Sequence, residues 1–208
     1  MAFLVFEGID GSGKSTLIDL FCNKLNEHKL PFIKTKEPGG TKIGKKIRRL
    51  LLEKTNTKLS PMTETLLYYA DRKQNIEEVI KPNLKKNITV ISDRYWASTS
   101  AYQYGGRKIS ENFITALRHQ ICKDYEPDLW ILLDIPIEIT LKRLFISKAN
   151  KRDRMEMENS SFHQKVRDYY LSLAKKNPEK WLILKGEKKS SILLEELISH
   201  LKSKKILF

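Results

Sequence analysis

The sequence predicts an α/β protein in which a five-stranded, mainly parallel sheet is wrapped by helices. Three observations predict it: five short apolar runs occur along the chain, segments with apolar residues at helical spacing lie between them, and the two kinds of segment alternate throughout. This alternation favours right-handed crossovers and places ligands at the carboxyl ends of the strands. With 208 residues, of which 40% are hydrophobic, the chain is expected to form a single domain, 1–208.

The expected strands are AFLVFE from Ala2, PFIKTK from Pro31, ITVISD from Ile88, LWILLD from Leu129 and WLILK from Trp181. Four of them are nearly continuous apolar runs, which is typical of strands covered on both faces, and PFIKTK is weaker. Apolar residues at helical spacing follow the first strand, at Leu17, Leu20, Phe21 and Leu25. One polar stretch, ISKANKRDRMEMENSS, interrupts the pattern before a further helix. We expect a mobile lid there, at about 146–158.

The composition limits the partners that we expect. The chain has 39 Lys and Arg against 25 Asp and Glu, a net charge of +14 that attracts nucleic acid, acidic membranes or phosphorylated small molecules. The excess is mostly lysine scattered along helical segments, with few aromatic residues interleaved for base stacking. We therefore expect small phosphorylated molecules and no nucleic acid. A nucleic-acid-binding or regulatory module remains the alternative.

Cysteine usage and the first residues indicate the compartment. Cys22 and Cys122 lie far apart, each in an apolar helical pattern, so we expect two buried thiols and neither a disulfide nor a metal knuckle. The stretch MAFLVFEG lacks the basic and apolar regions of an export signal, and no apolar run reaches about 18 residues. The sequence predicts a cytoplasmic protein with no membrane partner.

The stretch FEGIDGSGKST carries the strongest signal in the chain. Gly8, Gly13, Lys14 and Ser15 satisfy G-x-x-x-x-G-K-[ST], and the motif lies between the end of the first strand and the start of helical periodicity. Glycines let successive N–H groups point at an anion, and the helix N-terminus adds partial positive charge. Lys14 is expected to reach the outer phosphates and Ser15 to offer its hydroxyl to Mg²⁺. A P-loop NTPase site is predicted, and the alternative is a glycine-rich turn capped by Ser12 or Ser15.

The third strand ends in SDRY, which places Asp93 and Arg94 near this loop. An aspartate there can bind Mg²⁺ through water, and an arginine can bridge phosphates, a pairing that suits transfer between two bound phosphate groups. The alternative is a structural Asp–Arg ion pair. A GTPase is disfavoured because the sequence NKRD, from Asn150, follows a helical run and not a buried strand. An ATPase motor is disfavoured because 208 residues leave no room for a second functional domain.

Over nearly its full length the chain resembles a bacterial thymidylate kinase, a nucleoside monophosphate kinase that transfers the terminal phosphate of ATP to dTMP. The resemblance is carried by the order and spacing of FEGIDGSGKST, TKEPGGT, LLYYADR, SDRYWASTSAYQ, PDLWILLDIP and DRMEMENSSFHQKVRDYY. It implies the activity that forms dTDP for dTTP synthesis, with Mg²⁺ as cofactor and ATP as co-substrate. It also implies a homodimer.

The resemblance assigns the donor site to the P-loop. Its ATP-binding residues are Gly8, Ile9, Asp10, Gly11, Ser12, Gly13, Lys14, Ser15 and Thr16, and its metal-binding residues are Ser15 and Asp93. Asp10 is an exception within the loop, since phosphate repels a carboxylate. By resemblance it contacts the deoxyribose 3′-hydroxyl of the acceptor.

The resemblance assigns the dTMP site to residues from five segments of the chain. They are Asp10, Glu37, Pro38, Arg48, Tyr68, Arg72, Arg94, Ser98, Thr99, Tyr102 and Gln103. By resemblance Tyr68 stacks on thymine, Arg72 donates to its O4 and Thr99 bonds its N3. Tyr102 crowds the position of a ribose 2′-hydroxyl. The alternative is that Tyr68 fills the core and that Arg72 is a solvated cation.

Two further choices concern arginines. Arg48 rather than Arg49 is expected to bind the dTMP phosphate with Arg94, because neighbours on a helix point about 100° apart. Since the residue before Gly13 is not an arginine, the chain resembles members whose lid supplies the transition-state cation. The basic lid residues are Arg143, Lys148, Lys151, Arg152 and Arg154. Arg152 and Arg154 join Lys14, Asp93 and Arg94 as the expected catalytic set. Which lid cation acts stays open.

Among enzymes, a deoxynucleoside kinase or another nucleoside monophosphate kinase is the alternative. Arg72, Thr99 and Tyr102 argue against it, because they match residues that recognise thymine and deoxyribose in thymidylate kinases. Whether the peptide between Glu37 and Pro38 is cis cannot be decided from sequence.

Overall fold

The computed structural model describes residues 1–53, 59–148 and 153–208. Its centre is a sheet of five parallel strands in the order β2-β3-β1-β4-β5. The strands are β1 (Phe3–Glu7), β2 (Phe32–Lys36), β3 (Thr89–Asp93), β4 (Leu129–Asp134) and β5 (Trp181–Lys185). The predicted α/β class with a five-stranded parallel sheet is confirmed, and the first three strands each begin one residue later than predicted.

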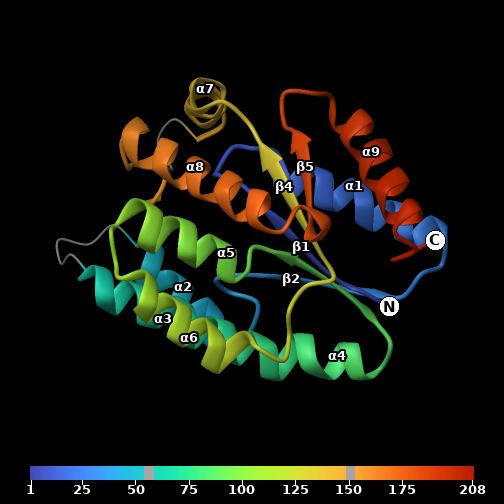
Figure 1. The fold of residues 1–208 in the computed structure, drawn as a ribbon, viewed down its shortest axis with the longest axis horizontal. Coiled ribbons are helices and arrows are strands. Elements are labelled where there is room, and N and C mark those ends of the chain that lie inside the picture. Colours follow the sequence, from blue (N-terminus) through green and yellow to red (C-terminus); the bar gives the residue numbers. More distant parts are fainter. Residues whose placement is uncertain (54–58, 149–152) are drawn as a thin grey trace.

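Helices cover both faces of this sheet (Figure 1). They are α1 (Lys14–Glu27), α2 (Lys42–Leu52), α3 (Pro61–Asn75), α4 (Lys81–Lys85), α5 (Trp96–Thr99), α6 (Glu111–Cys122), α7 (Ile137–Lys148), α8 (Ser160–Lys176) and α9 (Ser190–Ser203). Two π-helical segments, η1 (Ile76–Ile80) and η2 (Ser100–Gly106), and a 3₁₀ turn, η3 (Pro178–Lys180), complete the described elements. Among the described residues, no helix is long and apolar enough to cross a membrane.

Two apolar clusters, one on each face of the sheet, form the core. On one face Phe21 of α1 and Leu197 of α9 pack against the sheet. On the other face, Tyr69 of α3, Ile114 of α6 and Val166 of α8 do so. The continuous apolar sequences of β1 and β4 are explained by their central position, since both of their faces meet helices. The two cysteines are buried and free, as predicted.

One of the two edge strands departs from the predicted pattern. WLILK was expected to be covered on both faces, but β5 lies at the edge of the sheet and Ile183 is 46% exposed. An apolar run does not distinguish a central strand from an edge strand, because the order of strands in a sheet depends on how distant segments of the chain pack together. PFIKTK, the weaker run, forms the other edge as β2.

Side-chain caps determine where two helices near the site begin. Ser60 Oγ accepts a hydrogen bond from the Thr63 amide, 3.1 Å away, at the start of α3, and Pro61 occupies the first helical position. Asn159 Oδ1 accepts from the Phe162 amide, 2.8 Å away, at the start of α8. The two caps therefore define the first residues of α3 and α8.

The predicted lid, at about 146–158, has several parts. Its first residues, from Ile146, belong to the end of α7, and residues 153–158 form a succession of turns before α8. Lys151 and Arg152 lie outside the described residues, as does the side chain of Lys148. The mobility of the lid stays a prediction.

Candidate active site

The P-loop connects β1 to α1 and curls around its own lysine. Gly8 has a φ of 137°, and a Cβ there would lie 2.7 Å from the Leu133 carbonyl oxygen, so only glycine fits this close approach to β4. Lys14 Nζ donates hydrogen bonds to the carbonyl oxygens of Gly8, at 2.8 Å, and Ile9, at 3.0 Å. An ammonium group has three protons, so Lys14 keeps one donor for a ligand.

A first pocket, called here the phosphate pocket, opens at the N-terminus of α1. It is lined by Asp10, Gly11, Gly13, Lys14, Ser15, Thr16, Lys34, Lys36, Glu37, Arg48, Asp93, Arg94, Arg143, Leu144, Ile146, Asp153 and Glu156. Six of these residues are cationic, and a helix N-terminus faces the same space. The combination is typical of a polyphosphate site.

A second pocket, called here the acceptor pocket, lies between α3 and η2. It is lined by Asp10, Glu37, Pro38, Arg48, Leu52, Tyr68, Arg72, Arg94, Ser98, Thr99, Tyr102, Asp153 and Met155. Ten of the eleven residues predicted to bind dTMP are in this lining. Tyr68 lies in the pocket wall, while its neighbour Tyr69 is the one that fills the core.

The two pockets meet. Asp10, Glu37, Arg48, Arg94 and Asp153 line both of them. Two ligands bound side by side would therefore share these walls, and the cations Arg48 of α2 and Arg94, which follows β3, would lie at the junction.

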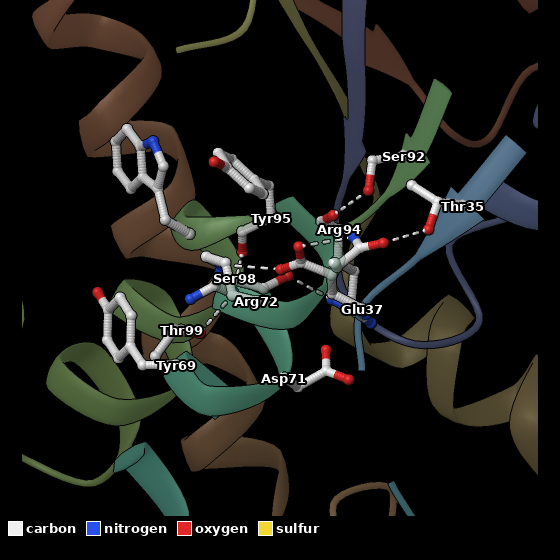
Figure 2. A network of polar contacts seen from close by, with 12 residues as sticks. Thr35, Glu37, Tyr69, Asp71, Arg72, Ser92, Arg94, Tyr95, Ser98 and Thr99 are labelled. Carbon is white, nitrogen blue, oxygen red and sulfur yellow. Dashed lines mark hydrogen bonds and ion pairs between the residues drawn. The ribbon is translucent and has the colours of Figure 1, made fainter. Parts of the chain in front are cut away.

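Arg72 and Glu37 form a buried ion pair in the wall of the acceptor pocket (Figure 2). Arg72 Nε donates to Glu37 Oε2 at 2.7 Å, and Arg72 Nη2 donates to Thr99 Oγ1 at 2.9 Å and to the Tyr95 carbonyl oxygen at 3.0 Å. Arg72 Nη1 is buried and has no hydrogen-bond partner among the described residues. Arg72 is 1% exposed, so the alternative of a solvated cation is wrong. Its free donor is available to a ligand in the pocket.

Arg94 is held by contacts on several sides. Its Nη2 donates to Asp10 Oδ1 at 2.6 Å, and its Nη1 donates to the Gly8 carbonyl oxygen and to Ser98 Oγ, both at 3.0 Å. Its backbone has a φ of 75°, a left-handed conformation that is uncommon for a side chain of this size. The Tyr102 ring lies 5.4 Å from the guanidinium carbon.

These contacts change the pKa values at the junction. Burial lowers the pKa of Lys14 to about 8, and the positive charge of Arg94 adds to this effect. Burial alone would raise the pKa of Asp10, but the charges of Arg94 and Lys14 outweigh it, and the net pKa is well below the ordinary value. For Arg94, burial alone would lower the pKa, but the negative charge of Asp10 outweighs burial and the net pKa is raised. Asp10 and Arg94 therefore stay charged at neutral pH.

The residues predicted to bind Mg²⁺ lie in the same pocket. Ser15 and Asp93 both line the phosphate pocket, and Asp93 Oδ1 is buried without a hydrogen-bond partner among the described residues. A hydroxyl and a carboxylate oxygen are suitable donors for Mg²⁺, which also takes water and substrate phosphate as ligands. The residues therefore fit the ion.

Arg48 and Arg49 separate as expected from helix geometry. Arg48 lines both pockets, and its Nη1 donates to the Pro38 carbonyl oxygen at 2.8 Å. Arg49 lines neither. The peptide between Glu37 and Pro38 is cis.

Among the described residues, five predicted site residues line neither pocket: Gly8, Ile9 and Ser12 of the P-loop, and Gln103 and Arg154. Gln103, expected to bind dTMP, is fully buried and donates to Glu64 Oε1 at 2.6 Å. Arg154, expected to act on phosphate, forms an ion pair with Glu64 and lines neither pocket. A buried carboxylate on α3 attracts the donors of both side chains. Within the described residues, Arg143 is the arginine of α7 in the phosphate pocket, whereas Arg152 lies outside them.

Sequence reasoning missed the residues behind the pockets. Glu7 is 0% exposed, and its carboxylate accepts from the Tyr95 and Ser98 amides, from Ser98 Oγ and from Tyr170 Oη. Burial raises its pKa. A charge inside the apolar run FLVFE was a signal for such a network, because buried charges need partners. No comparable signal indicated Glu64.

Comparisons with known proteins agree with the geometry. The thymidylate kinase family model matches residues 6–197. The chain is 40% identical to the thymidylate kinase of Sulfurihydrogenibium over 205 residues, covering 99% of this chain and 98% of the relative. It is 36% identical to that of Bdellovibrio bacteriovorus over 210 residues, with coverages of 100% and 98%. A crystal structure of thymidylate kinase from Ehrlichia chaffeensis superposes with a TM-score of 0.79 at 30% identity, covering 96% and 98% of the two chains. By sequence and by structure, the chain belongs to the thymidylate kinase family.

Proposed function

We propose that the protein transfers the terminal phosphoryl group of ATP to dTMP, giving ADP and dTDP for dTTP synthesis. The observation that carries this proposal is the junction of the two pockets, where five side chains line both. A donor in one pocket and a monophosphate in the other would meet end to end at this junction. The family to which the chain belongs supports the same reaction.

The reaction needs alignment and charge neutralisation more than proton transfer. A phosphate oxygen of dTMP attacks the terminal phosphorus of ATP while the bond to the bridging oxygen of ADP breaks, and no general base is required because the attacking oxygen is already anionic. Lys14 and Arg94 would neutralise the transferred group, and Arg48 would hold the acceptor phosphate. Mg²⁺, held through Ser15 and Asp93, would neutralise phosphate charge when bound. Among the described residues, Arg143 is the cation of α7 that lines the phosphate pocket and could contact the transferred group.

Base and sugar recognition follow from the acceptor pocket. The free Nη1 of Arg72 suits a carbonyl oxygen such as thymine O4, whereas the amino group of cytosine at that position would leave the buried donor unpaired. Tyr68 would stack on the base. Tyr102 Oη donates to Asp10 Oδ2 at 3.2 Å, so the ring is fixed beside the carboxylate that we assign to the 3′-hydroxyl.

We also propose a homodimer in the cytoplasm. Apolar side chains are exposed on neighbouring helices, at Ile43 and Leu50 of α2 and at Met62 and Leu66 of α3. Light scattering should give twice the chain mass of 24.3 kDa. The replacement Leu50→Glu should shift the mass toward that of one chain.

One acceptor panel tests the proposed reaction. The purified protein is incubated with ATP, Mg²⁺ and, separately, each common nucleoside and nucleoside monophosphate, and ADP release is measured. We expect dTMP to give the highest kcat/KM and EDTA to abolish turnover. A different preferred acceptor would refute the assignment to dTMP. Salt-dependent binding of DNA without turnover would favour the alternative, a module that binds nucleic acid and uses ATP only as a switch.

A further inference from the structure

Glu64 lies behind the acceptor pocket and does not line it. Its side chain is 1% exposed, and it belongs to α3, the same helix that provides Tyr68 and Arg72. Oε1 accepts hydrogen bonds from Gln103 Nε2, at 2.6 Å, and from Arg107 Nε, at 3.0 Å. Oε2 accepts from Arg154 Nη2. We call Glu64, Gln103, Arg107 and Arg154 the Glu64 cluster.

Through the two arginines, the cluster holds residues 153–158. Arg154 also donates from Nε and Nη2 to the Leu51 carbonyl oxygen, at 3.2 and 3.0 Å, at the C-terminal end of α2 where helix carbonyls lack partners. Arg107 Nη2 donates to Glu158 Oε1 at 2.7 Å. The segment is thus attached near both of its ends to elements of the acceptor site.

The held segment forms part of the acceptor pocket. Asp153 and Met155 line it on either side of Arg154, and Met155 is 3% exposed. Asp153 Oδ1 accepts from the amides of Met155 and Glu156, at 2.9 and 3.0 Å, which keeps the turn compact. Moving Arg154 away from Glu64 would therefore move two wall residues of the pocket.

Loss of Arg154 and loss of the Glu64 charge would leave the cluster in different states. With Arg154 absent, Glu64 would keep Arg107 and Gln103, so its carboxylate would not be left buried without a partner. With Glu64 neutralised, Arg107 and Arg154 would lose the carboxylate that separates two positive charges.

We propose that Glu64 is a positioning residue of the acceptor site, which holds residues 153–158 against the bound nucleotide through Arg154 and Arg107. The proposal rests on the proposed function, because it takes the pocket to be that of dTMP. It assigns Arg154 to holding the pocket wall. A cation that acts in the transition state would instead have to reach the phosphate pocket.

Steady-state kinetics separate the two roles of Arg154. We expect Glu64→Gln and Arg154→Gln each to raise KM for dTMP about tenfold, with KM for ATP and kcat at saturating dTMP within about threefold of wild type. Arg154→Lys, which keeps the charge, should recover part of the loss. Arg49→Gln serves as the matched control, since it removes an arginine that lines neither pocket, and it should change none of these values.

A fall in kcat of tenfold or more for Arg154→Gln, with KM for dTMP unchanged, would overturn the proposal and return Arg154 to the transition state. An unchanged KM for dTMP in both variants would also overturn it. If Glu64→Gln does not fold, Arg154→Gln decides alone, because its side chain is 26% exposed and its removal leaves Glu64 paired.

Hydrogen exchange gives a readout that does not depend on turnover. In wild type, dTMP should slow exchange of the Met155 and Glu156 amides, and in Arg154→Gln that protection should be reduced about tenfold. Equal protection in both proteins would refute the proposal. If the wild type fails to phosphorylate dTMP while some other monophosphate protects these amides, the proposed acceptor fails and the role of Glu64 stands.

Discussion

Arg94 Nη2 and Asp10 Oδ1 lie 2.6 Å apart, and this ion pair joins the P-loop to the end of β3. Both residues line the phosphate pocket and the acceptor pocket. The negative charge that Asp10 adds to this cationic site thus has a counter-charge, and the ion pair fixes an arginine that lines both pockets. The loop could bind a polyphosphate without this pair, but the acceptor would then lose an arginine that is held in a fixed position.

Replacing Asp10 with asparagine tests this role. Asp10→Asn should lower kcat/KM for dTMP by about tenfold to a hundredfold, because Arg94 loses its ionic partner and the substrate sugar loses a charged acceptor. KM for ATP should change less. Asp168→Asn, at an exposed position on α8, is the matched control. Equal losses in kcat/KM for ATP and dTMP would contradict the assignment of Asp10 to the acceptor side.

Replacing Lys14 tests transition-state stabilisation in the phosphate pocket. Lys14→Ala should lower kcat by about a hundredfold or more, since its charge faces the group being transferred. A coupled assay that follows ADP release measures this. Lys24→Ala, on the surface of the same helix, should retain wild-type turnover. Near-normal turnover of Lys14→Ala would remove Lys14 from the mechanism.

The pKa of Lys14 predicts a pH dependence. Its value of about 8 in the folded protein lies below the ordinary value of 10.5, so the free protein loses this positive charge as pH rises through about 8. Binding of ATP should restore the charge, with proton uptake and an affinity that falls as pH rises above 8. Between pH values of about 8 and 10.5, Lys14 is protonated in the unfolded chain and largely neutral in the folded one. This group therefore makes the free energy of unfolding increase with pH over that range.

Calorimetry in buffers of different ionisation enthalpy measures the proton uptake. Lys14→Arg keeps a fixed charge and should bind ATP without uptake from this group. Uptake of the same size in wild type and in Lys14→Arg would assign the proton to another group.

Tyr102 should control selection against ribonucleotides. Tyr102→Ala should lower the ratio of kcat/KM for dTMP to that for its ribonucleotide analogue, because the ring no longer crowds the sugar. Tyr102→Phe keeps the ring and loses only the hydrogen bond to Asp10, so it should retain most of the selection. The idea fails if the alanine variant has the wild-type ratio.

Tyr170 should stabilise the buried network that supports Arg94. Its Oη donates to Glu7 Oε2 at 2.8 Å and accepts from Arg94 Nη1 at 3.4 Å. Tyr170→Phe removes a donor from a fully buried carboxylate, so the free energy of unfolding should fall by about 1–3 kcal/mol. Urea denaturation measures this against Tyr104→Phe, a partly exposed neighbour in the core. An effect no larger than that of the control would exclude a structural contribution.

The sequence by itself determined the fold class and predicted most of the residues that line the two pockets. The β1 and β4 segments are apolar throughout because both faces are covered, and the P-loop was readable because close contact with phosphate requires glycines at fixed spacing. Ten of the eleven predicted dTMP-binding residues line one pocket, since the resemblance carried the order and spacing of whole segments. Periodicity also separated Arg48 from Arg49.

Tertiary structure alone decided which partners the buried charges find. Glu64, Gln103 and Arg154 are far apart in the chain, so no local pattern could show that Arg154 pairs with Glu64 of α3, whereas the resemblance had assigned Arg154 to the catalytic set. The same holds for the contact of Glu7 with Tyr170, and for the edge position of β5 despite its apolar sequence. Local sequence sets propensity and periodicity, whereas ion pairs and strand neighbours depend on how distant segments are packed together.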